Sequence, residues 1–324
     1  MEYTNDTSKD NGMKGIAEEL LNVTQQAAIA AYPLIGKCDK LRADDAGTKA
    51  MRYHLNNVDM YGRIVIGEGE MDEAPMLYIN EEVGTGKGIA VDIAVDPIEG
   101  TNLMATGKDN SLAVLAAARS GCLLHAPDMY MRKLAVGPEA KGKIDINAPL
   151  TDNMKAVAKA QGKDIRELTI MIQERDRHRE LINEVLQAGA KLKLFSDVDI
   201  TGAIGAAMDN IEIDMLVGTG GAPEGVVTAV ALKCLGGDFQ GQLVPQNKME
   251  YNRCRGMGIE DPYKVLQMND IVQGDDILFC ATGITDGLFL NGVKQRKSGK
   301  MYTHSLLLVG ANAKRYELIE GFHS

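Results

Sequence analysis

The chain has 324 residues, of which 45% are hydrophobic and 25% charged, and it carries a net charge of −10. This composition is typical of a globular protein, and the acidic balance argues against nucleic acid and anionic membrane surfaces as partners. It does not exclude an anionic small substrate, because bound divalent cations can reverse the sign of the local field. The five cysteines are odd in number and widely spaced, which predicts reduced thiols and a cytoplasmic protein.

The first half of the chain is expected to begin with a frayed polar stretch over residues 1–12, which lacks the pattern of a signal peptide. Apolar residues at helical spacing predict a helix over 13–32, stopped by the proline that follows. A second helix is expected to start after Asp44 or Asp45, either of which could cap it, and to run to about Val58. Strands are predicted at residues 63–70, 88–97 and 111–118.

The second half alternates strands and helices, which predicts an α/β fold with at least locally parallel strands. The tail at 292–310 is expected to form a hairpin that turns at Ser298 and Gly299. A chain of this length is near the size at which one core divides, so we expect two tightly packed halves, 13–160 and 161–324. Strands are predicted within 162–173 and at 190–195, 213–218 and 275–285, and helices at 177–189, from Asp199, and at 223–235.

The stretch AVDIAVDPIEGTNL, residues 90–103, begins as an apolar strand and ends in an acidic corner. Asp96 lies at the carboxyl end of the strand, where α/β proteins place ligand sites, and Glu99 follows across a Pro-Ile turn. Gly100 and Thr101 then open a predicted helix, whose first N–H groups can hold a phosphate. Hard oxygen ligands beside a phosphate are what Mg²⁺ or Mn²⁺ requires.

A capped turn is the main alternative for Asp96 and Glu99, because carboxylates at helix starts also satisfy backbone amides and the helix dipole. Taken alone, an Asp and a Glu at this spacing favour that alternative. The same arrangement of acids beside glycines and strand or helix ends recurs elsewhere, however, and this repetition favours a metal site. The further acidic candidates are Glu68 and Glu70, Glu224, and the group Asp39, Asp44 and Asp45.

The string DPIEGT resembles the signature of the lithium-sensitive, metal-dependent sugar and inositol phosphatases. The longer strings GEGEMDEAPMLYI, VDIAVDPIEGT, APDMYM and GGAPEGVV resemble the class II (glpX-type) fructose-1,6-bisphosphatases, and the resemblance runs from Met13 to the C-terminal hairpin. It implies a layered α-β-α-β-α sandwich of the sugar phosphatase type. It also implies hydrolysis of fructose 1,6-bisphosphate to fructose 6-phosphate and phosphate, in gluconeogenesis, with two or more Mn²⁺ or Mg²⁺ ions.

The resemblance also implies the site residues. The metal ligands it implies are Asp44, Glu68, Asp96, Glu99 and Glu224. The substrate contacts it implies are Glu99, Gly100 and Thr101, Tyr130, Arg175, Asp176 and Arg177, Asp197, Val198 and Asp199, and Gly221. In this assignment the N-terminal half carries the metal and phosphate motif, and the C-terminal half completes the site.

The chain departs from the expected pattern at two places. Residues 175–178 read Arg-Asp-Arg-His where the resemblance leads us to expect Lys-Pro-Arg-His, so we expect Asp176 to contribute no more than its backbone. The arginines and His178 remain the candidates for a cationic pocket that holds the distal phosphate, since Arg offers phosphate a bidentate fork. The string RADDAG has two acids where one is expected, so Asp45 competes with Asp44 as the ligand.

Metal-assisted in-line hydrolysis is the mechanism we expect, with Asp96 holding metal, Glu68 orienting the attacking water and Thr101 relaying a proton. Tyr130 is expected to pack on the sugar. A dual enzyme that also hydrolyses sedoheptulose 1,7-bisphosphate is the nearest alternative, and an inositol-type monophosphatase or a non-catalytic sugar-phosphate sensor is a weaker one. Relatives of this type suggest a homodimer or a homotetramer.

Overall fold

The computed structural model describes residues 12–69, 76–312 and 316–323. Of the stretch 1–12 that was expected to be frayed, only Gly12 is therefore described, and it opens a 3₁₀ helix. Glu70, a candidate beside Glu68, lies outside the described residues. No helix in the described ranges combines the length and the apolar character needed to cross a membrane.

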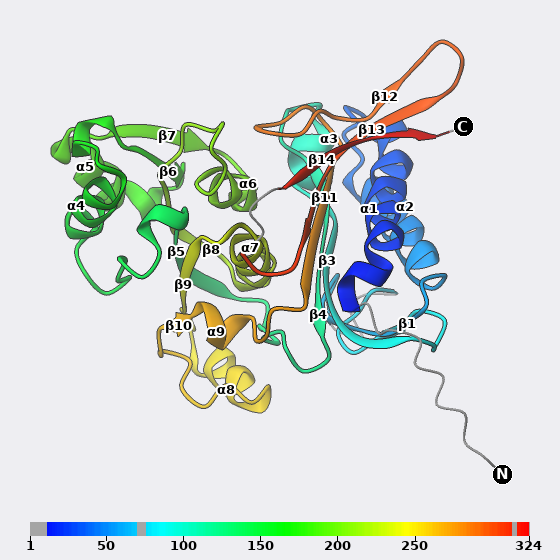
Figure 1. Cartoon of the computed structure of the whole chain (residues 1–324), viewed down its shortest axis with the longest axis horizontal. Coiled ribbons are helices and arrows are strands. Elements are labelled where there is room, and N and C mark those ends of the chain that lie inside the picture. Colours follow the sequence, from blue (N-terminus) through cyan, green and yellow to red (C-terminus); the bar gives the residue numbers. More distant parts are fainter. Residues whose placement is uncertain (1–11, 70–75, 313–315, 324) are drawn as a thin grey trace.

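Two mixed β-sheets and three helical layers alternate across the molecule (Figure 1). Helices α1 (Ala17–Ala31) and α2 (Lys40–Leu55) cover the outer face of the first sheet. Helices α6 (Asp199–Gly205) and α7 (Ala222–Leu235) lie between the two sheets, and α4 (Leu150–Gln161) and α5 (Arg179–Ala188) lie beyond the second sheet (Figure 1). The predicted α/β sandwich is confirmed.

The first sheet has the strand order β12-β13-β11-β4-β3-β1-β2, with β14 also paired to β13. Strands β1 and β3 are parallel and the other pairs are antiparallel. The strands are β1 (Met60–Ile66), β2 (Glu82–Val83), β3 (Ile89–Glu99), β4 (Leu112–Arg119), β11 (Ile277–Gly283), β12 (Lys294–Gln295), β13 (Met301–Val309) and β14 (Glu317–His323).

The second sheet has the order β10-β9-β5-β8-β6-β7, in which β6 runs parallel to both β7 and β8. The prediction of locally parallel strands in the second half of the chain is therefore confirmed. The first sheet takes strands from both ends of the chain and the second from its middle, while the division into halves near residue 160 stays a prediction. The strands are β5 (Tyr130–Val136), β6 (Thr169–Gln173), β7 (Lys191–Phe195), β8 (Met215–Gly221), β9 (Asp238–Leu243) and β10 (Leu266–Gln267).

Short helices complete the described structure. The short α-helices are α3 (Thr101–Ala105), α8 (Lys248–Gly256) and α9 (Met268–Ile271), and the 3₁₀ helices are η1 (Gly12–Ile16), η2 (Tyr32–Leu34), η3 (Pro138–Ala140), η4 (Ile165–Glu167) and η5 (Asp176–His178).

Helix α7 is the central element of the core. Every residue from Gly225 to Leu235 is buried, which is the pattern of a helix that is covered on all sides. It contacts β3, β4, β11 and β13 of the first sheet and β5, β8 and β9 of the second. Because both sheets hold this helix, its first turn at Glu224 has a fixed position between them.

The prediction for the start of the second helix was wrong. Helix α2 begins at Lys40, and the Asp39 carboxylate caps it by accepting a hydrogen bond from the Arg42 backbone N–H at 3.2 Å. Asp44 and Asp45 therefore lie inside the helix, where successive side chains point in different directions. The prediction of a C-terminal hairpin is confirmed, with Gly299 at φ 85° in the turn between β12 and β13.

Candidate active site

Strand β3 delivers two carboxylates to the space between the sheets. The Asp96 carboxylate accepts a hydrogen bond from the Ile98 backbone N–H at 2.9 Å, and the pairing of β3 with β4 shifts register between Asp96 and Glu99. Gly100 follows at φ 80°, a left-handed conformation that favours glycine. This break turns the chain at once into α3, so that Thr101 starts a new element beside the two acids.

An acidic cavity of about 270 Å³ lies at this point. It receives side chains from β3, α2, the segment after β1 and the first turn of α7. Its lining includes all five predicted metal ligands, together with the predicted catalytic Thr101: Asp44, Glu68, Asp96, Glu99, Thr101 and Glu224.

Asp44 and Asp45 differ clearly in their surroundings. The Thr101 hydroxyl lies 3.0 Å from Asp44 Oδ1 and 3.0 Å from the Ile98 carbonyl oxygen, and both Asp44 and Thr101 line the acidic cavity. Asp45 is exposed and forms an ion pair with Lys49, with 2.7 Å between Oδ1 and Nζ. Of the two acids, only Asp44 is therefore placed to meet a ligand in the cavity.

The carboxylates of the acidic cavity hold their protons more tightly than free carboxylates do. Burial, followed by repulsion from Asp96 and Glu224, raises the pKa of Glu99 well above its usual range. Burial also raises the pKa of Asp96, and a hydrogen bond with Glu99 lowers it by a smaller amount. The pKa of Glu68 is raised by partial burial of its carboxylate and then by Asp96 and Asp44, although the residue keeps an exposed surface. A nearby cation would stabilise the ionised form of each of these carboxylates and so lower its pKa.

Glu224 shows most directly that the cavity fits a cation. Its Oε2 atom is buried and has no hydrogen-bond partner among the described residues, and burial raises its pKa to about 6. A Cβ atom on Gly221 would lie 1.9 Å from that oxygen, so only glycine lets the carboxylate take this position. A buried carboxylate oxygen without a partner is costly, and metal coordination would satisfy it.

The donor set has the chemistry that Mg²⁺ and Mn²⁺ prefer, because it consists of carboxylate oxygens with a hydroxyl beside them. Within the ranges 12–69, 76–312 and 316–323, no three His, Cys, Asp or Glu side chains are already gathered in a metal-binding arrangement. The residues that would hold a cation here are Asp44, Glu68, Asp96, Glu99 and Glu224.

A second cavity of about 230 Å³, the distal cavity, adjoins the first and shares Glu99 and Glu224 with it. The structure does not bring Asp176 and His178 to its lining: Asp176 pairs with Arg179 at 2.8 Å, and the His178 ring is buried. The predicted substrate contacts that do line the distal cavity, besides the shared Glu99, are Tyr130, Arg175, Arg177, Asp197, Val198, Asp199 and Gly221.

Arg177 and Tyr130 form one wall of the distal cavity. The Arg177 guanidinium carbon lies 4.9 Å from the centroid of the Tyr130 ring, a cation–π distance. The same guanidinium donates to the Thr219 carbonyl oxygen through Nε and Nη2, at 3.0 and 2.8 Å. An exposed arginine is thereby held in one orientation beside an exposed tyrosine.

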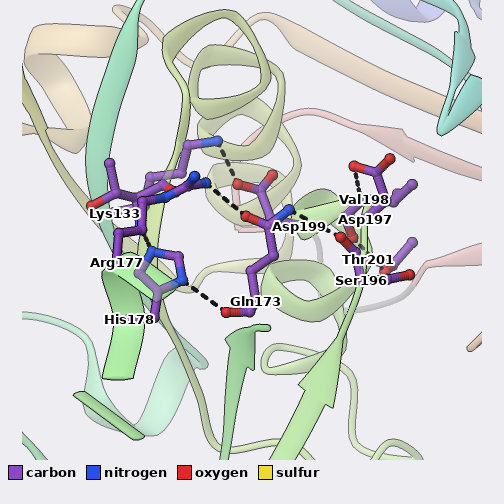
Figure 2. Close-up of polar contacts among 10 residues, drawn as sticks. Lys133, Gln173, Arg177, His178, Ser196, Asp197, Val198, Asp199 and Thr201 are labelled. Carbon is purple, nitrogen blue, oxygen red and sulfur yellow. Dashed lines mark hydrogen bonds and ion pairs between the residues drawn. The ribbon is translucent and has the colours of Figure 1, made fainter. Parts of the chain in front are cut away.

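The lining of the distal cavity also contains a strained residue and the acid of a buried ion pair. Val198 has φ 71°, which is unfavourable for a β-branched residue and typical of functional sites. Next to it, the Asp199 carboxylate accepts a hydrogen bond from Lys133 Nζ at 2.7 Å, and the Lys133 side chain is only 1% exposed (Figure 2). The ion pair holds the Asp199 carboxylate at the cavity wall.

Sequence reasoning missed Lys133, Asp128 and Arg253. Lys133 comes from the strand YMRKLAV, where a lysine in an apolar run could have signalled a buried charge pair. Asp128 and Arg253 line the acidic cavity. Asp128 lies within the string APDMYM, whereas Arg253 comes from α8, far along the chain, and no local signal connects it to the site.

The family profile described as bacterial fructose-1,6-bisphosphatase, glpX-encoded, matches residues 14–323. The chain belongs to this family. Relatives in the glpX-type family include fructose-1,6-bisphosphatase 1 class 2 of Escherichia coli K12, which is 47% identical over 95% of each chain. The class 2 enzyme of Haemophilus influenzae is 42% identical over 96% of each chain. A relative from Synechococcus elongatus, named D-fructose 1,6-bisphosphatase class 2/sedoheptulose 1,7-bisphosphatase, is 46% identical over 91% of this chain and 92% of its own.

Replacing Asp44 and Asp45 separately tests which acid serves this glpX-type site. We expect Asp44→Asn to lower metal-dependent phosphate release at least about tenfold, as loss of a ligand or its support does. Asp45→Asn is the matched control, because it removes only an exposed ion pair, and its activity should stay within about twofold. The measurement is phosphate release with Mn²⁺ or Mg²⁺, after circular dichroism has shown that both variants are folded. Equal activity of the two variants would contradict the assignment of Asp44 to the site.

The raised pKa values predict how metal binding depends on pH. Folded carboxylates with raised pKa values bind more protons than the unfolded chain does, so chelator-treated protein loses stability as pH rises towards and through about 6, the pKa of Glu224. A cation must displace those protons and favours the ionised form. The increase in melting temperature on adding Mn²⁺ should therefore be larger at about pH 8 than at about pH 5.

Thermal unfolding with and without Mn²⁺ measures this difference, and Asp96→Asn serves as the variant with a weakened site. Equal metal-induced shifts at both pH values in the wild-type protein would contradict a cation held by these carboxylates.

Proposed function

We propose that the chain hydrolyses fructose 1,6-bisphosphate to fructose 6-phosphate and phosphate with the help of divalent cations. The observation that carries this proposal is the pair of adjoining cavities. One is lined by carboxylates and the Thr101 hydroxyl, and the other adds Arg175, Arg177 and Tyr130 to the acids of its lining. A substrate with a phosphate at each end of a sugar fits a reacting site beside a second cavity that presents two guanidinium groups. The family relationship supports the same substrate.

In this proposal, Asp44, Glu68, Asp96, Glu99 and Glu224 hold the cations, and Asp45 does not. A bound divalent cation would neutralise phosphate charge and lower the pKa of a water molecule. Glu68 orients the attacking water. The Thr101 hydroxyl, near Asp44 Oδ1 and the Ile98 carbonyl oxygen, passes a proton, and the backbone at Gly100 and Thr101 contacts the reacting phosphate.

The distal cavity binds the rest of the substrate. Tyr130 packs on the sugar, and Asp197, Val198, Asp199 and Gly221 contact its hydroxyls. Arg175 and Arg177 bind the second phosphate, because guanidinium groups pair strongly with phosphate oxygens. Asp176 contributes at most its backbone, since its carboxylate is paired with Arg179.

A dual activity on sedoheptulose 1,7-bisphosphate is the second candidate, because the Synechococcus elongatus relative carries that name. An inositol-type monophosphatase is less well supported, since it has no need of the arginines at the distal cavity. A non-catalytic sensor would not require Glu68 and Thr101 beside the other acids. The proposed setting is the cytoplasm and gluconeogenesis, with two or more Mn²⁺ or Mg²⁺ ions per site in a homodimer or homotetramer.

Phosphate release by the purified protein tests the proposal. The substrates are fructose 1,6-bisphosphate, sedoheptulose 1,7-bisphosphate, fructose 6-phosphate and inositol 1-phosphate, each with Mn²⁺, Mg²⁺ or chelator. We expect release from fructose 1,6-bisphosphate that is lost with chelator, and little from either monophosphate. Comparable release from sedoheptulose 1,7-bisphosphate would establish the dual activity. No release from any of the four would overturn the proposal in favour of a sensor.

A further inference from the structure

His178 joins two strands at the point where their pairing has ended. Strands β6 and β8 pair through Ile170 with Met215 and Met171 with Leu216. Further along, the His178 ring stands between Gln173 of β6 and Thr219 of β8. Its Nδ1 lies 2.8 Å from the Gln173 carbonyl oxygen (Figure 2), and its Nε2 lies 2.8 Å from the Thr219 backbone N. The imidazole thus takes the place of one hydrogen-bonded step of the sheet.

These two contacts define the protonation state of the ring. The Thr219 backbone N–H can only donate, so Nε2 must accept and carries no proton. The proton of the neutral ring then lies on Nδ1, which donates to the Gln173 carbonyl oxygen. Burial lowers the pKa of His178, and the side chain is only 1% exposed. A ring in this state does not serve as a cation for phosphate.

The space for the ring depends on a glycine. A Cβ atom at Gly218 would lie 3.2 Å from His178 Cε1, which is tighter than ordinary van der Waals contact. The glycine before Thr219 therefore lets the imidazole approach β8 closely enough to accept its N–H. This close approach gives a structural reason for one glycine of the sequence GTGG.

The two residues that His178 joins are the same two that hold Arg177. The Arg177 guanidinium donates to the Thr219 carbonyl oxygen through Nε and Nη2, and Nη2 also donates to Gln173 Oε1 at 2.9 Å. Gln173 Nε2 in turn donates to the Ser196 carbonyl oxygen at 3.2 Å (Figure 2). Nη1 of Arg177 has no partner in the described part of the chain, so it is the atom left for a ligand.

We propose that His178 is a positioning residue, which bridges Gln173 and Thr219 and thereby aims the Arg177 guanidinium into the distal cavity. Without the bridge, the ends of β6 and β8 are free to separate, and the carbonyl and amide that hold Arg177 move with them. An exposed arginine without fixed acceptors samples many rotamers, and ordering it on binding costs conformational entropy. This inference rests on the proposed function, because it takes Arg177 as the contact of the distal phosphate.

Three replacements at His178 separate its two hydrogen bonds. Asparagine retains a polar group near the place of Nδ1, glutamine retains one near the place of Nε2, and phenylalanine retains the ring shape with neither. His323→Gln is the matched control, because His323 contacts Thr303 Oγ1 at 3.0 Å in the first sheet, far from Arg177 in the fold. If His178→Phe does not fold, the asparagine and glutamine variants carry the test.

Kinetics are measured with fructose 1,6-bisphosphate and with fructose 1-phosphate, which retains the reacting ester but lacks the distal phosphate. His178→Phe should raise KM for the bisphosphate about tenfold or more and leave kcat within about twofold. His178→Asn and His178→Gln should raise KM for the bisphosphate by a smaller factor. KM for fructose 1-phosphate should change little in any of them, and the control should match the wild type.

The double variant with Arg177→Ala identifies the route of the effect. If His178 acts through Arg177, then Arg177→Ala alone raises KM for the bisphosphate, and adding His178→Gln to it causes no further rise. A full additional rise would overturn the inference, as would wild-type KM values in the His178 variants or equal increases for both substrates. Arg177→Ala with an unchanged KM would instead contradict the distal phosphate contact in the proposed function.

Discussion

The burial of several carboxylates around one cavity, together with their mutual repulsion, is the constraint on which the rest of the structure depends. Asp96 and Glu99 lie at the end of β3, and Glu224 lines the same cavity with a buried oxygen that has no hydrogen-bond partner among the described residues. Packing these groups together opposes their ionisation. A divalent cation between them would turn the repulsion into attraction, so the arrangement is suited to a ligand-bound state.

The layered fold keeps these acids in place despite their repulsion. Strand β3 belongs to one sheet, whereas α7 is enclosed by both, so neither carboxylate-bearing element can move without disturbing the core. The cationic side chains lie around this centre: Lys133 is paired with Asp199, and Arg177 is held by Thr219. The two adjoining cavities therefore differ: both contain acids, but the distal cavity adds the guanidinium groups of Arg175 and Arg177, which suits a substrate with a second phosphate.

The sequence predicts the parts of this account that depend on local pattern. The alternation of elements, the C-terminal hairpin and the strand that carries Asp96 all follow from hydrophobic periodicity and turn residues. The set of five predicted metal ligands comes from the family resemblance, and all five line one cavity in the structure. The start of α2 was missed because Asp39, Asp44 and Asp45 are all acceptable caps, and only the fold decides which one is used. Lys133 was missed, and His178 was assigned to a cavity that it does not line, for a related reason: the roles of both depend on partners far away in the sequence.

Titration of chelator-treated protein with Mn²⁺, followed by the electron paramagnetic resonance signal of the free ion, tests the central claim most directly. The account predicts saturable binding to the wild-type protein, strong weakening in Asp96→Asn and Glu224→Gln, and wild-type binding in Asp45→Asn. Absence of saturable binding to the wild type, or undiminished binding in the first two variants, would contradict the claim that these carboxylates together form a cation site.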